Sequence, residues 1–140
     1  MSKILTRDTF RRLILTRNNG NCVVPECALP AVDAHHILNR RLFKQPEEFG
    51  GYFVENGAGL CSHHHMAAEF TIISTRDLYL FCGINEPCIP AHLSKENEYD
   101  TWGNVVVNEY SRVKGELFDD EGCQKALRAG SVLWHFQQVA

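Results

Sequence analysis

The stretch GLCSHHHMAAE, residues 59–69, places three consecutive histidines two residues after a cysteine and four residues before a glutamate. Its composition is typical of a helix, in which side chains four residues apart share a face and neighbours are rotated by about 100°. His65 and Glu69 therefore share one face, and His64 points toward another. His63 points away again, and we interpret it as a solvated side chain. The adjacent histidines can thus belong to different sites.

A Cys-x4-Cys segment upstream of this stretch supplies two further soft ligands. A structural zinc ion takes four Cys or His side chains in a tetrahedron, and thiolates select zinc over magnesium. Two cysteines on a turn that contains Pro25 give one ligand pair, and a Cys-x2-His at the helix start gives the other. We therefore predict a zinc site formed by Cys22, Cys27, Cys61 and His64. The alternative is three buried thiols and an exposed histidine.

A pair of adjacent histidines, His35 and His36, lies in VDAHHIL, a segment that predicts a short strand over 32–38. Neighbouring side chains on a strand point to opposite faces, but at a frayed end both can reach one cleft. The two histidines can then divide the work, with one binding a metal ion and the other staying free as a base. The alternative is an ordinary histidine pair at the edge of the domain.

Together these motifs resemble the HNH endonuclease family. The residues that carry the resemblance span about 20–70 and are, in order, Cys22-x4-Cys27, Asp33-x-His35-His36-Ile37, Asn56 and Leu60-Cys61-x2-His64-His65-x3-Glu69. The resemblance implies a ββα-metal fold, in which two antiparallel strands and a helix clasp one divalent ion. It also implies hydrolysis of phosphodiester bonds in nucleic acid, in DNA more than in RNA. We therefore expect an α+β protein with a ββα-metal (HNH) core, a structural zinc knuckle, an N-terminal helix and additional C-terminal helices.

The resemblance implies a role for each matching residue. His36 would be the general base that takes a proton from the attacking water, and Asn56 would brace the loop that holds it. His35, His65 and Glu69 would hold the catalytic ion. Because a carboxylate is a hard ligand, Glu69 favours Mg²⁺ or Mn²⁺ over zinc at this position.

The sequence departs from the family pattern at the zinc ligands. The spacing Cys22-x4-Cys27 is wider than the common Cys-x2-Cys, and His64 stands where a second cysteine is common. Asp33 is expected to orient a histidine through its ring N–H, or else to be a capping or surface residue. For Asn56, an ordinary Asn-Gly turn is the alternative.

The formal net charge of −3 hides an uneven distribution. Residues 1–44 hold eight Lys and Arg against three Asp and Glu, a net charge of +5, so the rest of the chain carries −8. A basic segment is what a phosphate-binding face needs, because Lys and Arg displace condensed counterions. The residues with this potential are Arg40, Arg41 and Lys44 on a predicted exposed loop over 39–51, followed by Arg7, Arg11 and Arg12 on a predicted N-terminal helix. A solvated surface of mixed charge is the alternative.

The length of 140 residues, with 44% apolar and 22% charged side chains, indicates one globular domain over 1–140. The HNH-like core would occupy about 20–70, and 71–140 would elaborate it in a role that the sequence does not indicate. The expected elements besides those above are a second core strand over 52–60, helices from Thr6 to the Asn18-Asn19-Gly20 stop, over 74–83 and over 119–130, and a strand over 104–110.

The sequence has no span of about 20 apolar residues, and its N-terminus lacks the apolar centre of a secretion signal. Six cysteines in such a chain favour metal ligands or free thiols over disulfides. We therefore expect a protein of the cytoplasm, in a bacterial or a host cell, that has no membrane partner. Cys82, Cys88 and Cys123 are interpreted as plain thiols, and Trp102 as a core anchor more than a base-stacking side chain.

Three functions remain open from the sequence. The preferred one is a metal-dependent endonuclease with structural zinc and catalytic Mg²⁺ or Mn²⁺. The second is a non-catalytic, zinc-stabilised nucleic-acid-binding module, and the third is an interaction protein whose acidic C-terminal half binds a protein partner. The catalytic metal ligands and His36 distinguish the first from the second, because a module that only binds needs neither.

Overall fold

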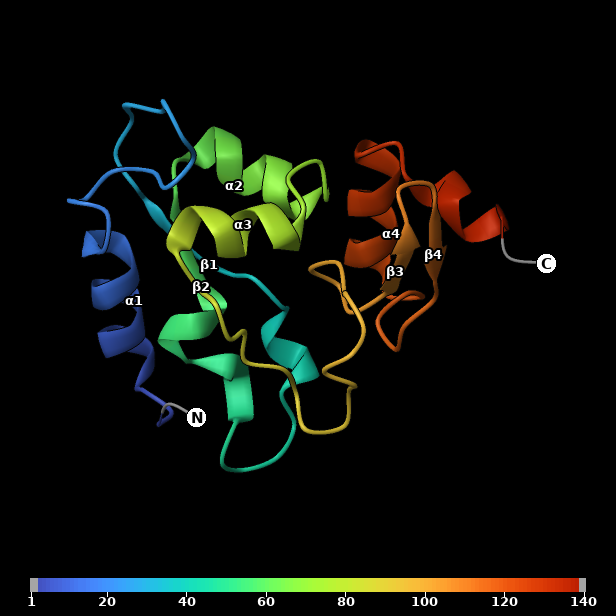
Figure 1. Ribbon diagram of the computed structural model, residues 1–140, viewed down its shortest axis with the longest axis horizontal. Helices are drawn as coiled ribbons and strands as arrows, with labels where there is room; N and C mark the ends of the chain where they lie inside the picture. Colours follow the sequence, from blue (N-terminus) through green and yellow to red (C-terminus); the bar gives the residue numbers. More distant parts are fainter. Residues whose placement is uncertain (1–2, 139–140) are drawn as a thin grey trace.

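The computed structural model describes residues 3–138 and combines α-helices with two small antiparallel sheets (Figure 1). The expected α+β class is therefore confirmed at this level. The elements of the described residues are, in chain order, α1 (Arg7–Thr16), β1 (Asp33–His36), β2 (Gly57–Leu60), α2 (Ser62–Glu69), α3 (Thr75–Cys82), β3 (Val105–Asn108), β4 (Ser111–Val113) and α4 (Glu121–Ala129), together with four short 3₁₀ segments. None of these helices has the length and apolar character needed to cross a membrane.

The first sheet consists of β1 and β2, which pair antiparallel with His36 opposite Gly57. Helix α1 lies against this sheet through its two buried side chains, Phe10 and Ile14. A Cβ atom at Gly57 would collide with both of these side chains. The glycine is thus required by the close approach of the helix, which brings the N-terminal arginines to the edge of the sheet.

The second strand is shorter than predicted. The strand expected over 52–60 begins only at Gly57, because Val54–Asn56 forms a 3₁₀ turn. The turn buries Asn56 completely, and the Asn56 side chain hydrogen-bonds to the backbone of Leu38 in place of strand pairing. The simple Asn-Gly turn considered from the sequence is therefore replaced by a buried amide that joins two segments.

Helices α2 and α3 begin and end close to the predicted positions, because each has a local capping residue. At the start of α2 the Cys61 sulfur accepts a hydrogen bond from the His64 N–H at 3.4 Å. At the start of α3 the Ser74 hydroxyl accepts from the Asp77 N–H at 3.0 Å, and Gly83 ends the helix with a φ of 68°. The core beneath these helices contains Ile37, Ala58, Leu60, Ala68 and Leu78.

The prediction that 39–51 is an exposed loop is wrong for part of the segment. Leu42 is fully buried in a core cluster with Tyr99. The carboxylate of Glu48 is also buried, and it accepts a hydrogen bond from the Ala91 N–H at 2.9 Å. Both partners lie more than 40 residues later in the chain, so the polar composition of the segment does not reveal its burial.

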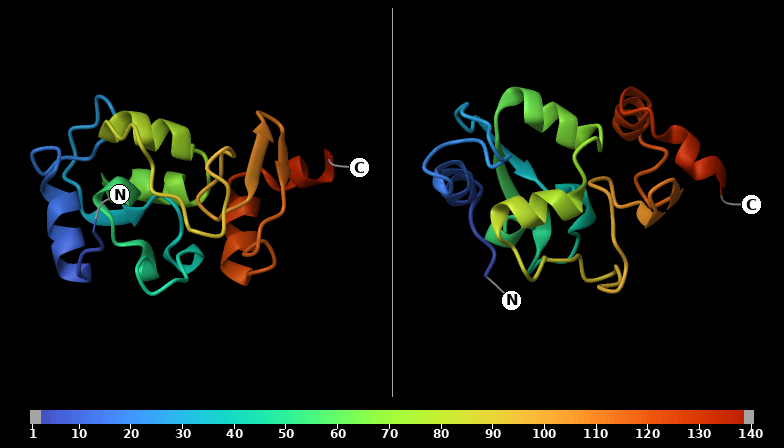
Figure 2. Two further views of the ribbon diagram at one scale, coloured as in Figure 1. Left: turned by 60° about the horizontal axis from the view of Figure 1, so that its bottom comes forward. Right: turned by 45° about the horizontal axis from the view of Figure 1, so that its top comes forward.

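Residues 100–136 form a C-terminal lobe at the opposite end of the molecule from α1 (Figure 2). The lobe contains the β3–β4 hairpin, α4 and the start of a 3₁₀ segment at Leu133–Gln138; β4 and this segment were not predicted from the sequence. Its buried cluster consists of Trp102, Cys123, Ala126, Leu127 and Phe136. The interpretation of Trp102 as a core anchor is therefore confirmed.

Candidate metal centres

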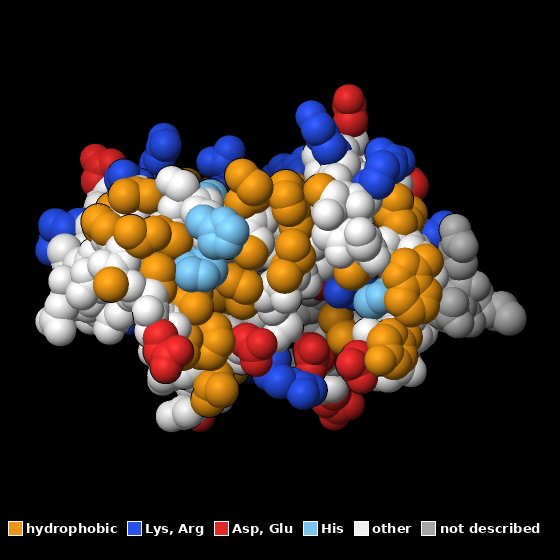
Figure 3. Space-filling view, turned by 90° about the horizontal axis from the view of Figure 1, so that it is seen from above, with side chains coloured by type: hydrophobic (Ala, Val, Ile, Leu, Met, Phe, Trp, Pro, Cys, Tyr) orange, Lys and Arg blue, Asp and Glu red, His pale blue; other side chains and the backbone are white. Residues whose placement is uncertain are grey.

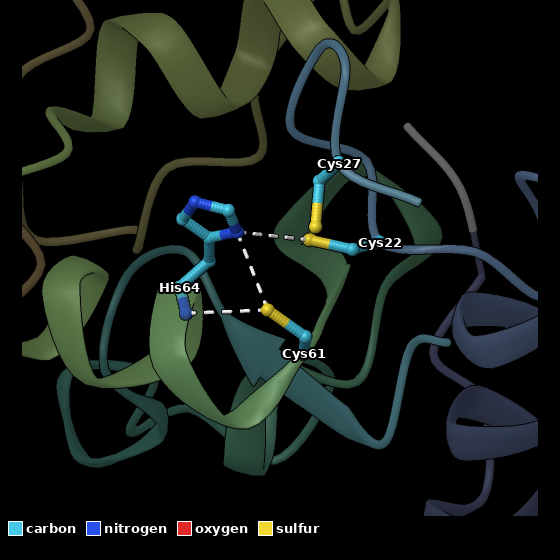
Figure 4. Close-up of side chains that lie close together, drawn as sticks. All are labelled: Cys22, Cys27, Cys61 and His64. Carbon is cyan, nitrogen blue, oxygen red and sulfur yellow. Dashed lines mark hydrogen bonds between the residues drawn. The ribbon is translucent and has the colours of Figure 1, made fainter. Parts of the chain in front are cut away.

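The predicted zinc ligands come together at the start of α2. One donor atom from each of Cys22, Cys27, Cys61 and His64 lies within 4.8 Å of the others. Figure 4 shows the four side chains pointing toward one another, with His64 Nδ1 lying 3.5 Å from Cys22 Sγ and 3.3 Å from Cys61 Sγ. Ligands at about 2.3 Å from a tetrahedral centre lie roughly 3.8 Å apart. The cluster can therefore bind a metal ion such as zinc.

Two separate segments position these donors. The turn that follows α1 carries the first cysteine pair, and the Cys22 N–H donates to the Leu29 carbonyl at 2.9 Å, which closes the loop between them. Burial raises the pKa of the Cys22 thiol to about 11. Burial acts the same way on Cys61, but hydrogen bonds from the His64 backbone and neighbouring thiols lower the pKa of Cys61 overall. Of these two cysteines, Cys61, the N-cap of α2, therefore loses its proton more easily than Cys22.

A second group of donors lies on the other side of the same helix. His35, His65 and Glu69 each offer one ligand atom within 4.8 Å of the others. His65 Nε2 lies 3.2 Å from Glu69 Oε1, and His65 Nδ1 lies 3.2 Å from Asp33 Oδ2. His35 is almost completely buried, and its Nε2 atom has no hydrogen-bond partner among the described residues. A buried nitrogen without a partner beside an imidazole and a carboxylate fits a ligand to a divalent ion.

The electrostatic environment keeps His35 neutral. Burial lowers the pKa of His35 to about 3, and the charges of His65 and His36 act in the same direction. The hydrogen bond with Glu69 raises the pKa of His65, against the effect of burial. His35 therefore has a lone pair available at neutral pH, as a metal ligand must.

His36 lies next to this group but makes different contacts. Its ring stacks on Phe10 at 4.8 Å between centroids and meets the edge of Tyr52 at 5.2 Å. Burial and the charge of Arg40 lower the pKa of His36 to about 4, while a hydrogen bond with the Gly50 backbone opposes them. His36 is therefore neutral at pH 7, and its Nε2 atom is both buried and without a partner among the described residues.

The side chain of Asn56 fixes the backbone just after His36. Its Oδ1 accepts from the Leu38 N–H at 2.9 Å, and its Nδ2 donates to the carbonyls of Leu38 and Gly51 at 3.0 and 3.2 Å. All polar atoms of this amide are thus used in joining the end of β1 to the segment that precedes β2. The Gly50 backbone hydrogen-bonds to His36, and the Asn56 amide also holds this segment through its bond to the Gly51 carbonyl.

A pocket of about 420 Å³ opens beside His36 and the second donor group. Four of the six arginine and lysine candidates line it, namely Arg7, Arg11, Arg40 and Arg41. Lys44 is paired with Glu116 and lies outside the lining, as does Arg12. Seen from above, Lys and Arg are the more numerous charged side chains along one edge and Asp and Glu along the opposite edge, although each edge carries both signs (Figure 3).

Several pocket residues were not identified from the sequence as part of the site. They are Phe10, Ala34, Asn39, Tyr52 and Thr101, together with Trp102, which was considered only as a core residue or a base-stacking one. Phe10 lies three residues after Arg7, a helical spacing that indicates a shared face; for Tyr52 the sequence contains no such signal. His63 is exposed, as predicted, and does not line the pocket.

Comparisons with protein-family models, with curated proteins and with solved structures found no match for this chain. A larger pocket, of about 1520 Å³, lies between α1, α3 and the segment after α3, and none of the candidate site residues lines it. The smaller pocket is therefore the one in which donors, a neutral histidine and cationic side chains meet.

Proposed function

We propose that the protein is a metal-dependent endonuclease of the HNH type, which hydrolyses phosphodiester bonds in nucleic acid, in DNA more than in RNA. The observation that carries the proposal is the single pocket that gathers three metal-ligand candidates, a neutral histidine and four arginines. The antiparallel β1–β2 pair followed by α2 supports it, because the donors then come from one strand and one helix, as the family resemblance implies.

His35, His65 and Glu69 would hold the catalytic ion, and the carboxylate among them favours Mg²⁺ or Mn²⁺. When bound there, a divalent ion supplies Lewis-acid stabilisation of the charge that develops on a phosphodiester. The cysteine-rich cluster would hold zinc in a structural role, because all four of its positions are filled by protein ligands.

His36 would act as the general base. Its imidazole would take a proton from the attacking water, and burial keeps the ring neutral at physiological pH. The rings of Phe10 and Tyr52 hold the imidazole plane on two sides, and Asn56 fixes the backbone that follows it. A base that is already oriented loses little freedom when the substrate arrives.

The arginines of the pocket would hold the phosphates of the substrate. Arg7 and Arg11 are four residues apart on α1, so they share a face, and Arg40 and Arg41 come from the 3₁₀ segment Arg40–Leu42. Guanidinium groups bind phosphate oxygens in a bidentate manner and contribute affinity that depends on salt but not on base sequence.

The His36→Ala variant tests the catalytic role. We expect it to cleave supercoiled plasmid in Mg²⁺ or Mn²⁺ about 10²–10⁴-fold more slowly than the wild type, because general-base catalysis contributes that much. The matched control is His63→Ala, which removes an exposed imidazole outside the pocket and should cleave like the wild type.

Zinc content and the melting temperature of both variants are measured alongside, so that loss of fold is not read as loss of catalysis. Unchanged cleavage by His36→Ala would refute the general-base role. A wild type that binds DNA but cleaves no nucleic acid with any of these ions would instead support the non-catalytic zinc-stabilised binding module.

A further inference from the structure

The C-terminal lobe contacts both elements that carry the candidate catalytic ligands. We propose that Trp102 is a positioning residue through which this lobe holds Glu69 in the metal site. The inference rests on the proposed function in one respect, namely that Glu69 holds the catalytic ion. It assigns a role to residues 71–140, for which the sequence indicates none.

The contact with α2 is made at its last residue. The indole Nε1–H of Trp102 donates to the main-chain carbonyl of Glu69 at 2.9 Å, and Trp102 is only 7% exposed. The last four carbonyls of a helix have no partner within the helix, so their hydrogen bonds must come from elsewhere. Trp102 provides that partner at the residue whose carboxylate lies against His65.

The contact with β1 is made by the neighbouring residue. The Asn39 N–H donates to the Thr101 carbonyl at 2.8 Å, and the Thr101 hydroxyl donates to the His36 carbonyl at 3.4 Å. Two successive residues of the lobe therefore bridge the end of β1 and the end of α2. These are the two elements between which the ion would bind.

The turn that carries both residues is itself held firmly. The buried carboxylate of Asp100 accepts hydrogen bonds from the Trp102 N–H at 2.9 Å and the Asn104 N–H at 3.0 Å, and it pairs with Arg112 at 3.0 Å. Arg112 also donates to the Thr71 hydroxyl at 3.0 Å, two residues after Glu69. The turn is thus a rigid support for the indole.

The C-terminal end of α4 also contacts the end of α2. The backbone of Gly130 lies so close to the Phe70 carbonyl that no Cβ fits there. The lobe therefore touches Glu69, Phe70 and Thr71 in succession. Because α2 has only eight residues, and short helices fray at their ends, these contacts decide where the Glu69 carboxylate lies.

The test compares Trp102→Phe with Cys123→Ala. The first variant keeps an aromatic ring but loses the N–H donor to Glu69, and the second trims the same buried cluster at a residue of α4 while the Trp102–Glu69 hydrogen bond stays in place. Mn²⁺ affinity is measured by calorimetry below the melting temperature, and backbone amide exchange is measured over 66–72. We expect Trp102→Phe to bind Mn²⁺ about tenfold more weakly and to exchange faster at the end of α2, with zinc content unchanged.

Cys123→Ala should lower the melting temperature yet keep wild-type Mn²⁺ affinity and exchange rates over 66–72. The proposal is overturned if Trp102→Phe matches the wild type in amide exchange, or if Cys123→Ala reproduces its effects. A wild type that binds no Mn²⁺ would refute the proposed function, and the exchange rates would still decide whether Trp102 holds the end of α2.

Discussion

His65 contacts a carboxylate through each of its ring nitrogens, Asp33 at Nδ1 and Glu69 at Nε2. A ring nitrogen that binds a metal ion must present a lone pair, so the proton resides on the other nitrogen. If Nδ1 carries the proton, Asp33 can accept a hydrogen bond from it. The lone pair is then on Nε2, the nitrogen that lies near Glu69 in the second donor group. Of the two roles considered for Asp33 from the sequence, the contact favours orientation of a histidine.

The pKa of Asp120 provides a prediction at the same scale. The Arg41 guanidinium and the Cys123 N–H hold the pKa of this carboxyl at about 2. A lowered pKa in the folded state means that the charged form stabilises the fold above the unfolded pKa of about 3.9, and that this stabilisation is lost as the pH falls toward 2. We expect Arg41→Gln to raise the pKa of Asp120 and to move acid unfolding to higher pH.

Carboxyl titration by NMR checks this prediction directly. The control is Lys44→Gln, because Lys44 pairs with Glu116 and not with Asp120. An Asp120 pKa that stays near 2 in Arg41→Gln would contradict the assignment of Arg41 as its main partner.

At the level of elements, the turn after α1 and the start of α2 depend on the cysteine-rich cluster. We expect about one tightly bound zinc per chain, and we expect Cys27→Ser to lose it and unfold this part of the protein. Zinc binding contributes roughly 10–16 kcal/mol in small zinc domains, which is comparable to the whole stability of a typical domain. Elemental analysis and thermal unfolding with and without a chelator measure both effects.

Cys82→Ser is the matched control for that variant. The Cys82 thiol is half-buried, outside the cluster, and weakly bonded to the Gly57 carbonyl at 3.8 Å. Its loss should leave zinc content unchanged. A wild type that is stable and free of zinc would refute the zinc knuckle.

The elements with local signals were predictable from the sequence. Helices α2, α3 and α4 follow capping residues that hydrogen-bond within four positions, among them Ser74 and Asp120. β4 has only three residues and pairs with β3 through an irregular register, so no alternation of apolar and polar residues marks it. Asn56 looks like a turn residue from its neighbours, because its partner Leu38 is 18 positions away.

At the scale of the whole molecule, the metal-ligand candidates were predictable from the sequence, but several side chains that line the pocket around them were not. The motif spacing brings His65 and Glu69 to one face of a helix, which is a local property. Tyr52 and Trp102 reach the pocket through packing that no local pattern encodes, whereas the spacing of Phe10 from Arg7 on α1 is a local signal. The prediction of the site thus included the metal-ligand candidates and four arginines of the pocket, and it missed other side chains that line the pocket.

Both donor groups include residues of α2 or its cap. Cys61 and His64 belong to the cysteine-rich cluster, and His65 and Glu69 belong to the group with His35. Ions bound at the two ends of so short an element share a thermodynamic cycle, and any coupling between them must be reciprocal. If zinc tightens Mn²⁺ binding by a given factor, Mn²⁺ must tighten zinc binding by the same factor. Chelator competition for zinc, with and without Mn²⁺, therefore measures the occupancy of the proposed Mn²⁺ site, and His35→Ala should abolish the difference.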